Sequence, residues 1–224
     1  MNSLKLDVDG VLCISLKERE DRRKILSEEF SRLENDVEFV LVERDVENGE
    51  RGCFDSHVLC AKIALERNYK NVLILEDDAT LLPTPRKQVE RINAFLRLRK
   101  PQIFYLGGML GRMWAIPFLN VVRCRLTGTQ AYILSRKGCQ RLSKARYQGQ
   151  AIDGFYCRNF KAYGTYPMIS QQQPESVASS DIMDFRAQKK SKRVKDEAYW
   201  SQNYSSQKAA LRRGWARTLF MRFL

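Results

Sequence analysis

Three consecutive acidic residues, Glu76, Asp77 and Asp78, directly follow an apolar run at residues 72–75. A continuous apolar run of this length is typical of a buried strand in a parallel sheet. Carboxylates gathered at the end of such a strand repel one another and lose solvation unless a divalent cation neutralises them. Oxygen ligands suit Mg²⁺ or Mn²⁺, whose open coordination positions accept phosphate oxygens and water. The triplet predicts a metal-assisted phosphate site, although an ordinary acidic turn after a strand would look the same.

The segments around the triplet alternate between strand and helix patterns. Apolar runs predict strands at 11–16, 37–42, 72–75, 103–106 and 131–134. Periodic patterns predict helices at 18–33, from a cap at Asp55 or Ser56 to residue 67, and at 86–98, 136–145 and 152–162. This alternation indicates an α/β fold with a mostly parallel central sheet and helices on both faces. Ligands bind outside the carboxyl ends of the strands in such sheets, which is where the triplet falls.

The length, charge and cysteine content of the chain limit the number of domains, the kind of partner and the cellular compartment that we expect. Its 224 residues favour one domain, which we place at 1–182, followed by a basic C-terminal tail at 183–224. The formal charge of +13 calls for an anionic partner. Six scattered cysteines suit no zinc site and indicate buried reduced thiols. The chain has no apolar stretch of about 18 residues that could span a bilayer. Acidic residues near the N-terminus interrupt the apolar segment that a signal peptide needs, so we expect a cytoplasmic protein.

Several short motifs together resemble glycosyltransferase family 25, whose members include lipooligosaccharide and procollagen galactosyltransferases. They occur in the order in which that family carries them and span about residues 11–182. The motifs are ISL at 14–16 with RR at 22–23, GC at 52–53 with SH at 56–57, LILEDD at 73–78, GTQAYILS at 128–135 with Gly138 and Leu142, ID at 152–153, residues 167–171, and SDI at 180–182.

The resemblance implies a GT-A-type, Rossmann-like domain and an inverting transfer of a hexose. The favoured donor is UDP-galactose, and the acceptor is a hydroxyl group of a lipooligosaccharide-type glycan or of a protein. The acidic triplet would serve as the DXD-like motif of these enzymes, with Asp78 and Glu76 as ligands of Mn²⁺ or Mg²⁺ and with Glu76 and Asp77 contacting the donor. Such a metal acts as a Lewis acid on the departing nucleotide diphosphate.

Further donor contacts carry over from the other motifs. Ser15, Leu16 and Arg19 follow the first strand and are placed to meet the uridine or the diphosphate. Arg22 or Arg23 would also reach it, unless either pairs with Glu18 or Glu29 on the surface. Ser56 and His57, the single histidine, fall near a predicted helix start, where N–H groups favour a diphosphate; a structural role for His57 is equally open. Gln130 replaces the histidine that related sequences often carry, which leaves the sugar preference open.

Asp153 is the predicted base. An inverting transfer needs a group that takes the proton of the acceptor hydroxyl as it attacks the anomeric carbon. The resemblance offers Asp153 for this role. It also leaves open a second metal contact, a donor-sugar contact, and simple capping of a helix.

Two other interpretations compete with the glycosyltransferase. The segment at 6–12 resembles the nucleophile motif of haloacid dehalogenase-like phosphatases, with Asp7 as nucleophile and Asp9 as general acid. A basic non-catalytic module for membranes or nucleic acid would also explain the charge, but no nucleic-acid recognition motif is present, so no nucleic-acid partner is expected. In the tail, Leu211, Trp215, Leu219 and Phe223 recur every four residues among basic side chains. This pattern fits a helix on an anionic membrane surface, next to a lipid-linked glycan acceptor, or a helix packed on the domain.

Overall fold

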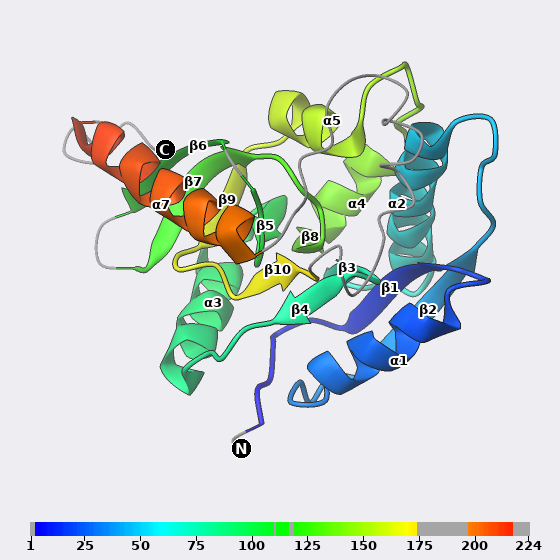
Figure 1. Ribbon diagram of the computed structural model, residues 1–224, viewed down its shortest axis with the longest axis horizontal. Coiled ribbons are helices and arrows are strands. Elements are labelled where there is room, and N and C mark those ends of the chain that lie inside the picture. The colour runs from blue at the N-terminus through cyan, green and yellow to red at the C-terminus, as the bar shows by residue number, and fades with distance from the viewer. Residues whose placement is uncertain (1–2, 110, 117–118, 174–196, 217–224) are drawn as a thin grey trace.

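An eight-stranded sheet forms the centre of the molecule (Figure 1). The structure is a computed structural model that describes residues 3–109, 111–116, 119–173 and 197–216. The order of the strands across the sheet is β2–β1–β3–β8–β5–β9–β7–β6. Their bounds are β1 (Gly10–Leu16), β2 (Val37–Val42), β3 (Asn71–Glu76), β5 (Ile103–Tyr105), β6 (Gly111–Ile116), β7 (Val121–Leu126), β8 (Ala131–Ser135) and β9 (Ala162–Thr165).

Helices cover both faces of this sheet, and a short second sheet lies beside it (Figure 1). The described helices are α1 (Glu20–Glu29), α2 (Gly49–Glu66), α3 (Arg86–Arg99), α4 (Arg136–Leu142), α5 (Ile152–Asn159) and α7 (Glu197–Arg213). In the second sheet, β4 (Ala79–Leu81) pairs antiparallel with β10 (Ser170–Gln172). Because β4 begins just after the acidic triplet, this small sheet fixes the path of the chain on leaving β3.

Six strands of the central sheet run in the same direction, whereas β7 and β8 run the opposite way. Parallel ladders join β1 to β2, β1 to β3 and β5 to β9. Every ladder that includes β7 or β8 is antiparallel. The predicted α/β class with a mostly parallel central sheet is therefore confirmed. The sequence pattern did not indicate that two of the strands run in the opposite direction.

The side chains of β3 alternate between two separate cores. Val72 and Ile74 belong to the core that β3 shares with α2, α4 and α5, while Leu73 and Leu75 belong to the core shared with α1 and α3. All four side chains are completely buried, and each contributes about 1.5–3 kcal/mol through removal from water. Successive side chains on a strand point to opposite faces of the sheet. The residues of β3 therefore pack alternately against the helices on one face and the helices on the other.

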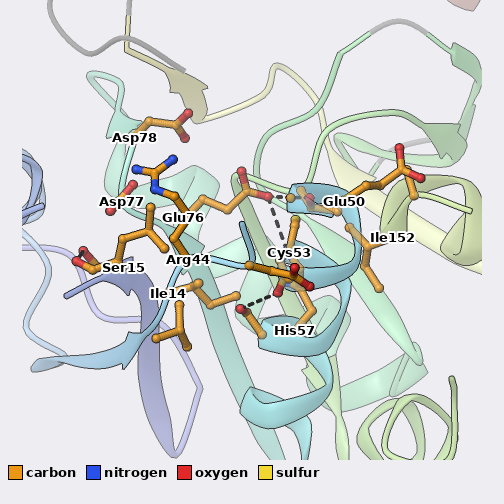
Figure 2. Close-up of a pocket in the computed structure, with 18 of the residues that line it drawn as sticks. Ile14, Ser15, Arg44, Glu50, Cys53, His57, Glu76, Asp77, Asp78 and Ile152 are labelled. Carbon is orange, nitrogen blue, oxygen red and sulfur yellow. Dashed lines mark hydrogen bonds and ion pairs between the residues drawn. The ribbon is translucent and has the colours of Figure 1, made fainter. Parts of the chain in front are cut away.

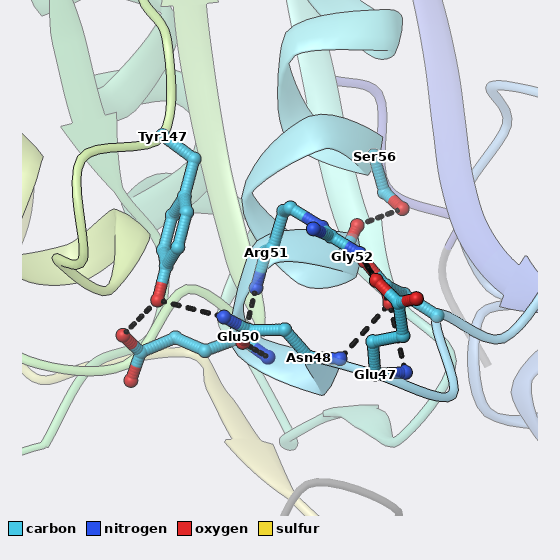
Figure 3. Close-up of polar contacts among 8 residues, drawn as sticks. Glu47, Asn48, Glu50, Arg51, Gly52, Ser56 and Tyr147 are labelled. Atoms are coloured by element: carbon cyan, nitrogen blue, oxygen red, sulfur yellow. Dashed lines mark hydrogen bonds and ion pairs between the residues drawn. The ribbon is translucent and has the colours of Figure 1, made fainter.

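The start of α2 differs from the prediction. The helix begins at Gly49 rather than near Asp55 or Ser56, because Asn48 caps it: the Asn48 side chain accepts hydrogen bonds from the backbone N–H groups of Glu50 and Arg51, each at 3.1 Å (Figure 3). Such a cap satisfies N–H groups that have no partner within the helix. Asp55, Ser56 and His57 consequently lie inside α2, and the expectation that His57 sits near a helix start was wrong.

A hairpin of β6 and β7 lies outside the predicted strands. Its register pairs Gly111 with Leu126 and Ile116 with Val121. Charged residues interrupt β7, and the guanidinium of Arg123 lies over the rings of Trp114 and Tyr163. Because of these charged residues, the sequence shows no continuous apolar run at β7. The strand forms nevertheless, since the aliphatic part of an arginine side chain can pack against a sheet.

The helix α7 in the C-terminal segment packs against β6 (Figure 1). Trp200, Asn203, Gln207 and Ala210 of this helix are buried, and the Gln207 amide donates to the backbone oxygen of Gly108 at 3.0 Å. Arg212 and Arg213 are exposed, and Trp215 is 61% exposed. The SDI motif at 180–182, residues 183–196 of the predicted basic tail, and Leu219 and Phe223 lie outside the described residues.

The six cysteines are all free thiols. Four of them are buried, as expected, whereas Cys53 and Cys157 are half-buried. Within the described ranges, no helix combines the length and the apolar character that crossing a membrane requires.

Candidate functional site

A cavity opens at the carboxyl ends of β1 and β3, the position expected for a ligand in an open α/β sheet. It encloses about 1260 Å³ of space, including its open mouth. The end of β1, the β2–α2 connection, the first turns of α2, the acidic triplet and the start of α5 all contribute to its walls. Of the predicted site residues, nine line the cavity: Ser15, Leu16, Arg22, Ser56, His57, Glu76, Asp77, Asp78 and Asp153.

Asp77 forms a buried ion pair on the α1 side of the cavity. Its carboxylate accepts a hydrogen bond from Arg22 Nη1 at 2.9 Å, and the two side chains are only 9% and 6% exposed. Burial raises the pKa of Asp77, while the charge of the Arg22 guanidinium opposes this change. Arg22 thus pairs with a buried carboxylate of the protein itself, and Glu18, one of the surface partners that the sequence left open, pairs with Arg44.

Glu76 faces the opposite side, toward α2. Its Oε1 atom lies 3.4 Å from Nε2 of His57 and accepts a hydrogen bond from the Thr129 hydroxyl. His57 is completely buried, and its Nδ1 atom lies 2.7 Å from the Tyr132 hydroxyl, which in turn lies 2.8 Å from the Tyr156 hydroxyl. A continuous line of polar groups therefore runs from the cavity into the core. Figure 2 shows Glu76 between Asp77 and Asp78 on one side and Cys53 and His57 on the other.

Asp78 lies in the turn between β3 and β4. Its Oδ2 atom accepts a hydrogen bond from the Gln172 amide at 3.3 Å, and its backbone oxygen accepts one from the N–H of Gln173 at 2.7 Å. The β4–β10 sheet therefore holds Asp78 at the cavity wall. β3 ends at Glu76, so the alternation of side chains along the strand does not extend to Asp78.

Asp153 lies across the cavity, in the first turn of α5. One carboxylate oxygen accepts a hydrogen bond from the N–H of Gly154 at 2.6 Å, and the other accepts from the N–H of Gly128 at 3.4 Å. The side chain thus faces the ligand space while it also satisfies backbone groups at the start of α5. The N-cap of α5 is Ala151, so the structure does not support the capping interpretation of Asp153, whereas its place at the cavity wall is compatible with the catalytic one.

The predicted contacts at the end of β1 divide into two groups. Ser15 and Leu16 line the cavity. Arg23 donates to the Leu16 backbone oxygen at 2.7 Å and to Ser15 Oγ at 3.2 Å, so it holds the end of the strand in place. Arg19 is not among the lining residues, and it donates two hydrogen bonds to the Asp21 carboxylate, at 3.1 and 3.0 Å.

Ser56 and Gln130 contribute less directly. The Ser56 hydroxyl donates to the Gly52 backbone oxygen at 2.7 Å within α2, although the residue lines the cavity. Gln130 is completely buried and is not among the lining residues. Neither polar atom of its amide has a hydrogen-bond partner within the described part of the chain. The predicted contact between Gln130 and the donor therefore has no counterpart in the geometry of the cavity.

Several lining residues were not singled out as site residues in the sequence. Cys53 lies one helical turn before His57, Thr129 donates to Glu76, and Gln172 donates to Asp78. Cys53 and Thr129 fall inside the family-like motifs, so the spacing of four between Cys53 and His57 was a usable signal. Gln172 is brought to Asp78 by the pairing of β10 with β4, which no local pattern reveals.

The charge of the cavity is opposite to that of the whole chain. Acidic residues outnumber the two arginines, Arg22 and Arg44, in its lining, although Lys17 pairs with Glu43 and Arg51 pairs with Asp45 from outside it. The lining carboxylates are Glu43, Asp45, Glu50, Glu76, Asp77, Asp78 and Asp153. An anionic ligand would be repelled here unless a cation accompanied it.

The phosphatase alternative does not fit this geometry. Asp7 and Asp9 precede β1, whose first residue is Gly10, so both lie at the amino end of the strand. Asp9 accepts hydrogen bonds from the N–H groups of Lys70 and Asn71, at 2.7 and 2.9 Å. A nucleophile should close a buried strand at its carboxyl end, and the cavity lies at that other end.

Comparisons with solved structures give distant similarities. A197 from STIV has a TM-score of 0.44 at 12% identity, over 73% of this chain and 81% of that one. HddC from Yersinia pseudotuberculosis has a TM-score of 0.41 at 12% identity, over 80% and 78%. A glycosyltransferase involved in glycosylation of the major capsid of PBCV-1 has a TM-score of 0.35 at 14% identity, over 59% and 63%.

The family assignment rests on the sequence. No curated protein matches the chain. The family model described as glycosyltransferase family 25 (LPS biosynthesis protein) matches residues 41–127, a segment that contains α2 and the acidic triplet. This match over residues 41–127 supports the family predicted from the motifs, and with it a glycosyltransferase.

Proposed function

We propose that the protein transfers a hexose, with galactose favoured, from a UDP-sugar to a hydroxyl group of a lipooligosaccharide-type glycan or a protein. The transfer depends on Mn²⁺ or Mg²⁺ and inverts the anomeric centre. The observation that carries this proposal is the cavity at the carboxyl ends of β1 and β3, whose lining brings Glu76, Asp78 and Asp153 together beside the Asp77–Arg22 pair. Such a site suits an anionic nucleotide-sugar only together with a cation.

The carboxylate groups that line the cavity are suitable ligands for Mg²⁺ or Mn²⁺. Asp78 and Glu76 supply carboxylate oxygens, the ligand type that Mg²⁺ and Mn²⁺ prefer. The Gln172 amide, which donates to Asp78 Oδ2, orients that carboxylate. When bound, the cation would supply Lewis-acid stabilisation of the charge that develops on the leaving diphosphate.

The chain's own residues then bind the donor and move a proton. Ser15 and Leu16, at the end of β1, form the wall that would contact the uridine or the diphosphate. Asp153 faces the same space from α5, where a carboxylate can accept the proton of the attacking acceptor hydroxyl. A contact between Asp153 and the donor sugar or the cation is the alternative role.

The binding step is tested by thermal unfolding with a panel of nucleotide-sugars, each with and without Mn²⁺. A ligand that binds the native state raises its stability in proportion to concentration and affinity. We expect UDP-galactose to raise the unfolding temperature only when Mn²⁺ is present. A shift of equal size without the metal would contradict metal dependence, and the absence of a shift with any nucleotide-sugar would contradict the donor class.

The catalytic step is tested by Asp78→Asn. We expect transfer to fall on the order of 100-fold or more, the scale for losing one preorganised charge-stabilising group. The matched control is Asp7→Asn, because it also removes one carboxylate charge and would abolish a phosphatase of the alternative type. Near-normal transfer in Asp78→Asn would contradict the assignment.

The basic C-terminal segment supports a further part of the proposal, contact with an anionic membrane that carries a lipid-linked acceptor. Arg212 and Arg213 are exposed, and Trp215 is 61% exposed beside them. Aromatic and basic side chains on one surface segment favour attachment to anionic lipid. Replacing both arginines with glutamate should weaken sedimentation with anionic vesicles and leave hydrolysis of the donor unchanged. Unchanged sedimentation would remove this part of the proposal.

A further inference from the structure

Cys53, His57 and Glu76 bring three different ligand atoms together on the α2 side of the cavity. The Cys53 thiol, a ring nitrogen of His57 and a carboxylate oxygen of Glu76 all lie within 4.8 Å of one another. Cys53 and His57 are four residues apart on α2, so their side chains stack on one face of the helix. Glu76 reaches them from the end of β3, which explains why the spacing of cysteines in the sequence did not reveal the cluster.

The surroundings of His57 point to a ligand at its Nε2 atom. The residue is completely buried, and Nε2 has no hydrogen-bond partner within the described part of the chain, although Glu76 Oε1 is only 3.4 Å away. The other ring nitrogen, Nδ1, lies 2.7 Å from the Tyr132 hydroxyl. A histidine that binds a metal commonly has its second nitrogen held in this way, because that contact fixes the ring and its tautomer.

The other two groups are also suited to ligation. Thr129 donates a hydrogen bond to Glu76 Oε1, as expected for a carboxylate that an outer shell of residues holds in position. Cys53 is half-buried and lines the cavity, so its thiol is accessible from the ligand space. Ligands on a long helix and at the end of a central strand are held more rigidly than ligands on loops.

From this arrangement we propose a second metal site, formed by Cys53, His57 and Glu76, that binds a thiophilic divalent cation of the zinc class. A set of thiolate, imidazole and carboxylate suits Zn²⁺, whereas Mg²⁺ and Mn²⁺ prefer oxygen ligands. Binding releases the Cys53 proton to solvent and forms a sulfur–metal bond, so a thiolate and a carboxylate balance the charge of the cation. Because Cys53, His57 and Glu76 all line the cavity, a bound cation would remain open to water or to an anionic oxygen from that side.

This site does not rest on the proposed function. It uses Glu76, which the proposed donor site also uses, but it does not include Asp78. Zinc bound there would place a cation at the wall of the donor cavity and would hold Glu76 against α2. Loss of Asp78 should therefore impair transfer without affecting this cluster, which separates the two sites experimentally.

The test is titration of the reduced, metal-free protein with Co²⁺, a spectroscopic substitute for Zn²⁺, in the presence of excess Mg²⁺. We expect a thiolate-to-cobalt charge-transfer band and visible bands of tetrahedral cobalt at one equivalent, all removed by Zn²⁺. Cys53→Ser should abolish the charge-transfer band and weaken Co²⁺ binding by more than about 100-fold, since loss of even a supporting residue costs about 10–100-fold. Glu76→Gln, which keeps the shape of the side chain, should weaken binding as well.

Two variants serve as controls. Cys157→Ser removes the other half-buried thiol, which donates to the Leu126 backbone oxygen and lies outside the cluster; it should keep the full spectrum. Asp78→Asn should keep the spectrum and lose transfer. Absence of the charge-transfer band in the wild-type protein, its survival in a folded Cys53→Ser variant, or its loss in Cys157→Ser would each overturn the proposal, whatever the transfer activity.

Discussion

The neighbouring carboxylates of Asp77 and Glu76 lie on two sides of the cavity and have different kinds of partner. On the α1 side, Asp77 is paired with Arg22, and both side chains are almost entirely buried. On the α2 side, Glu76 meets His57 and Thr129, and the polar contacts continue through two tyrosines into the core. The α1 side neutralises its carboxylate with a charge of the protein, whereas the α2 side leaves room for a cation. Glu76 is the last residue of β3 and Asp77 is the first residue of the turn that follows, so the two adjacent acids reach different environments.

The largest effect is expected on the α1 side. Arg22→Met should lower the free energy of unfolding by about 3–5 kcal/mol, because it leaves the buried Asp77 carboxylate without its counterion. Urea denaturation measures this loss. The matched control is Arg97→Met, which breaks an exposed pair with Asp7 and should change stability by only about 0–1 kcal/mol. Equal losses in the two variants would break the distinction between a buried and an exposed pair.

A smaller effect is expected in the polar line on the α2 side. Tyr132→Phe removes the hydroxyl that contacts both His57 and Tyr156, and it should lower the free energy of unfolding by about 1–3 kcal/mol, because buried polar groups lose their partner.

Tyr105→Phe is the control for this prediction. Tyr105 is equally buried and touches Tyr132, but its hydroxyl has no hydrogen-bond partner among the residues that the structure describes. Its removal should be neutral or slightly stabilising. If Tyr132→Phe were equally harmless in urea denaturation, the contacts from His57 to Tyr156 would not contribute to stability.

The smallest effect concerns Asp45, a carboxylate that lines the cavity and contacts Asn48 and Arg51 at the start of α2. Hydrogen bonds from Arg51 and from the N–H of Asn48 lower the pKa of Asp45 from 3.8 to about 2. Because the folded-state pKa is depressed, the stabilising contribution is present above the unfolded-state pKa and is lost as the pH falls from 3.8 toward 2.

Asp45→Asn tests this sign. Its unfolding temperature should be slightly below that of the wild-type protein near neutral pH, and the difference should shrink as the pH falls through this window. A difference that grows on acidification would show that the carboxylate is destabilising in the folded protein.

Much of the fold was visible in the sequence because local patterns determine it. The apolar runs predicted β1, β2, β3, β5 and β8 to within one or two residues at each end, and the helix at residue 86 was predicted with its start. The start of α2 was missed because its cap is a single asparagine within a polar stretch, where no apolar periodicity begins. The reversed direction of β8 was also missed, since strand direction depends on the connections and not on the run itself.

The candidate site was predictable in part. The triplet was found because three acidic residues at the end of an apolar strand stand out locally, whereas Asp153 was found only through the resemblance of the ID motif at 152–153 to the family. The pairing of Asp77 with Arg22 was not foreseeable, since 55 residues separate the partners and only the packing of α1 brings them together. Gln172 was missed for the same reason, because it reaches Asp78 across the pairing of β10 with β4.

The packing of α7 on β6 has a consequence for how the protein behaves in concentrated solution. β6 is an outermost strand of the central sheet, and such strands present backbone groups that can pair with a strand of another molecule. The helix lies so close that a side chain at Gly214 would meet the backbone oxygen of Met113 in β6. Because α7 packs against this strand, we expect it to hinder the approach of a second chain along β6 and so to disfavour self-association.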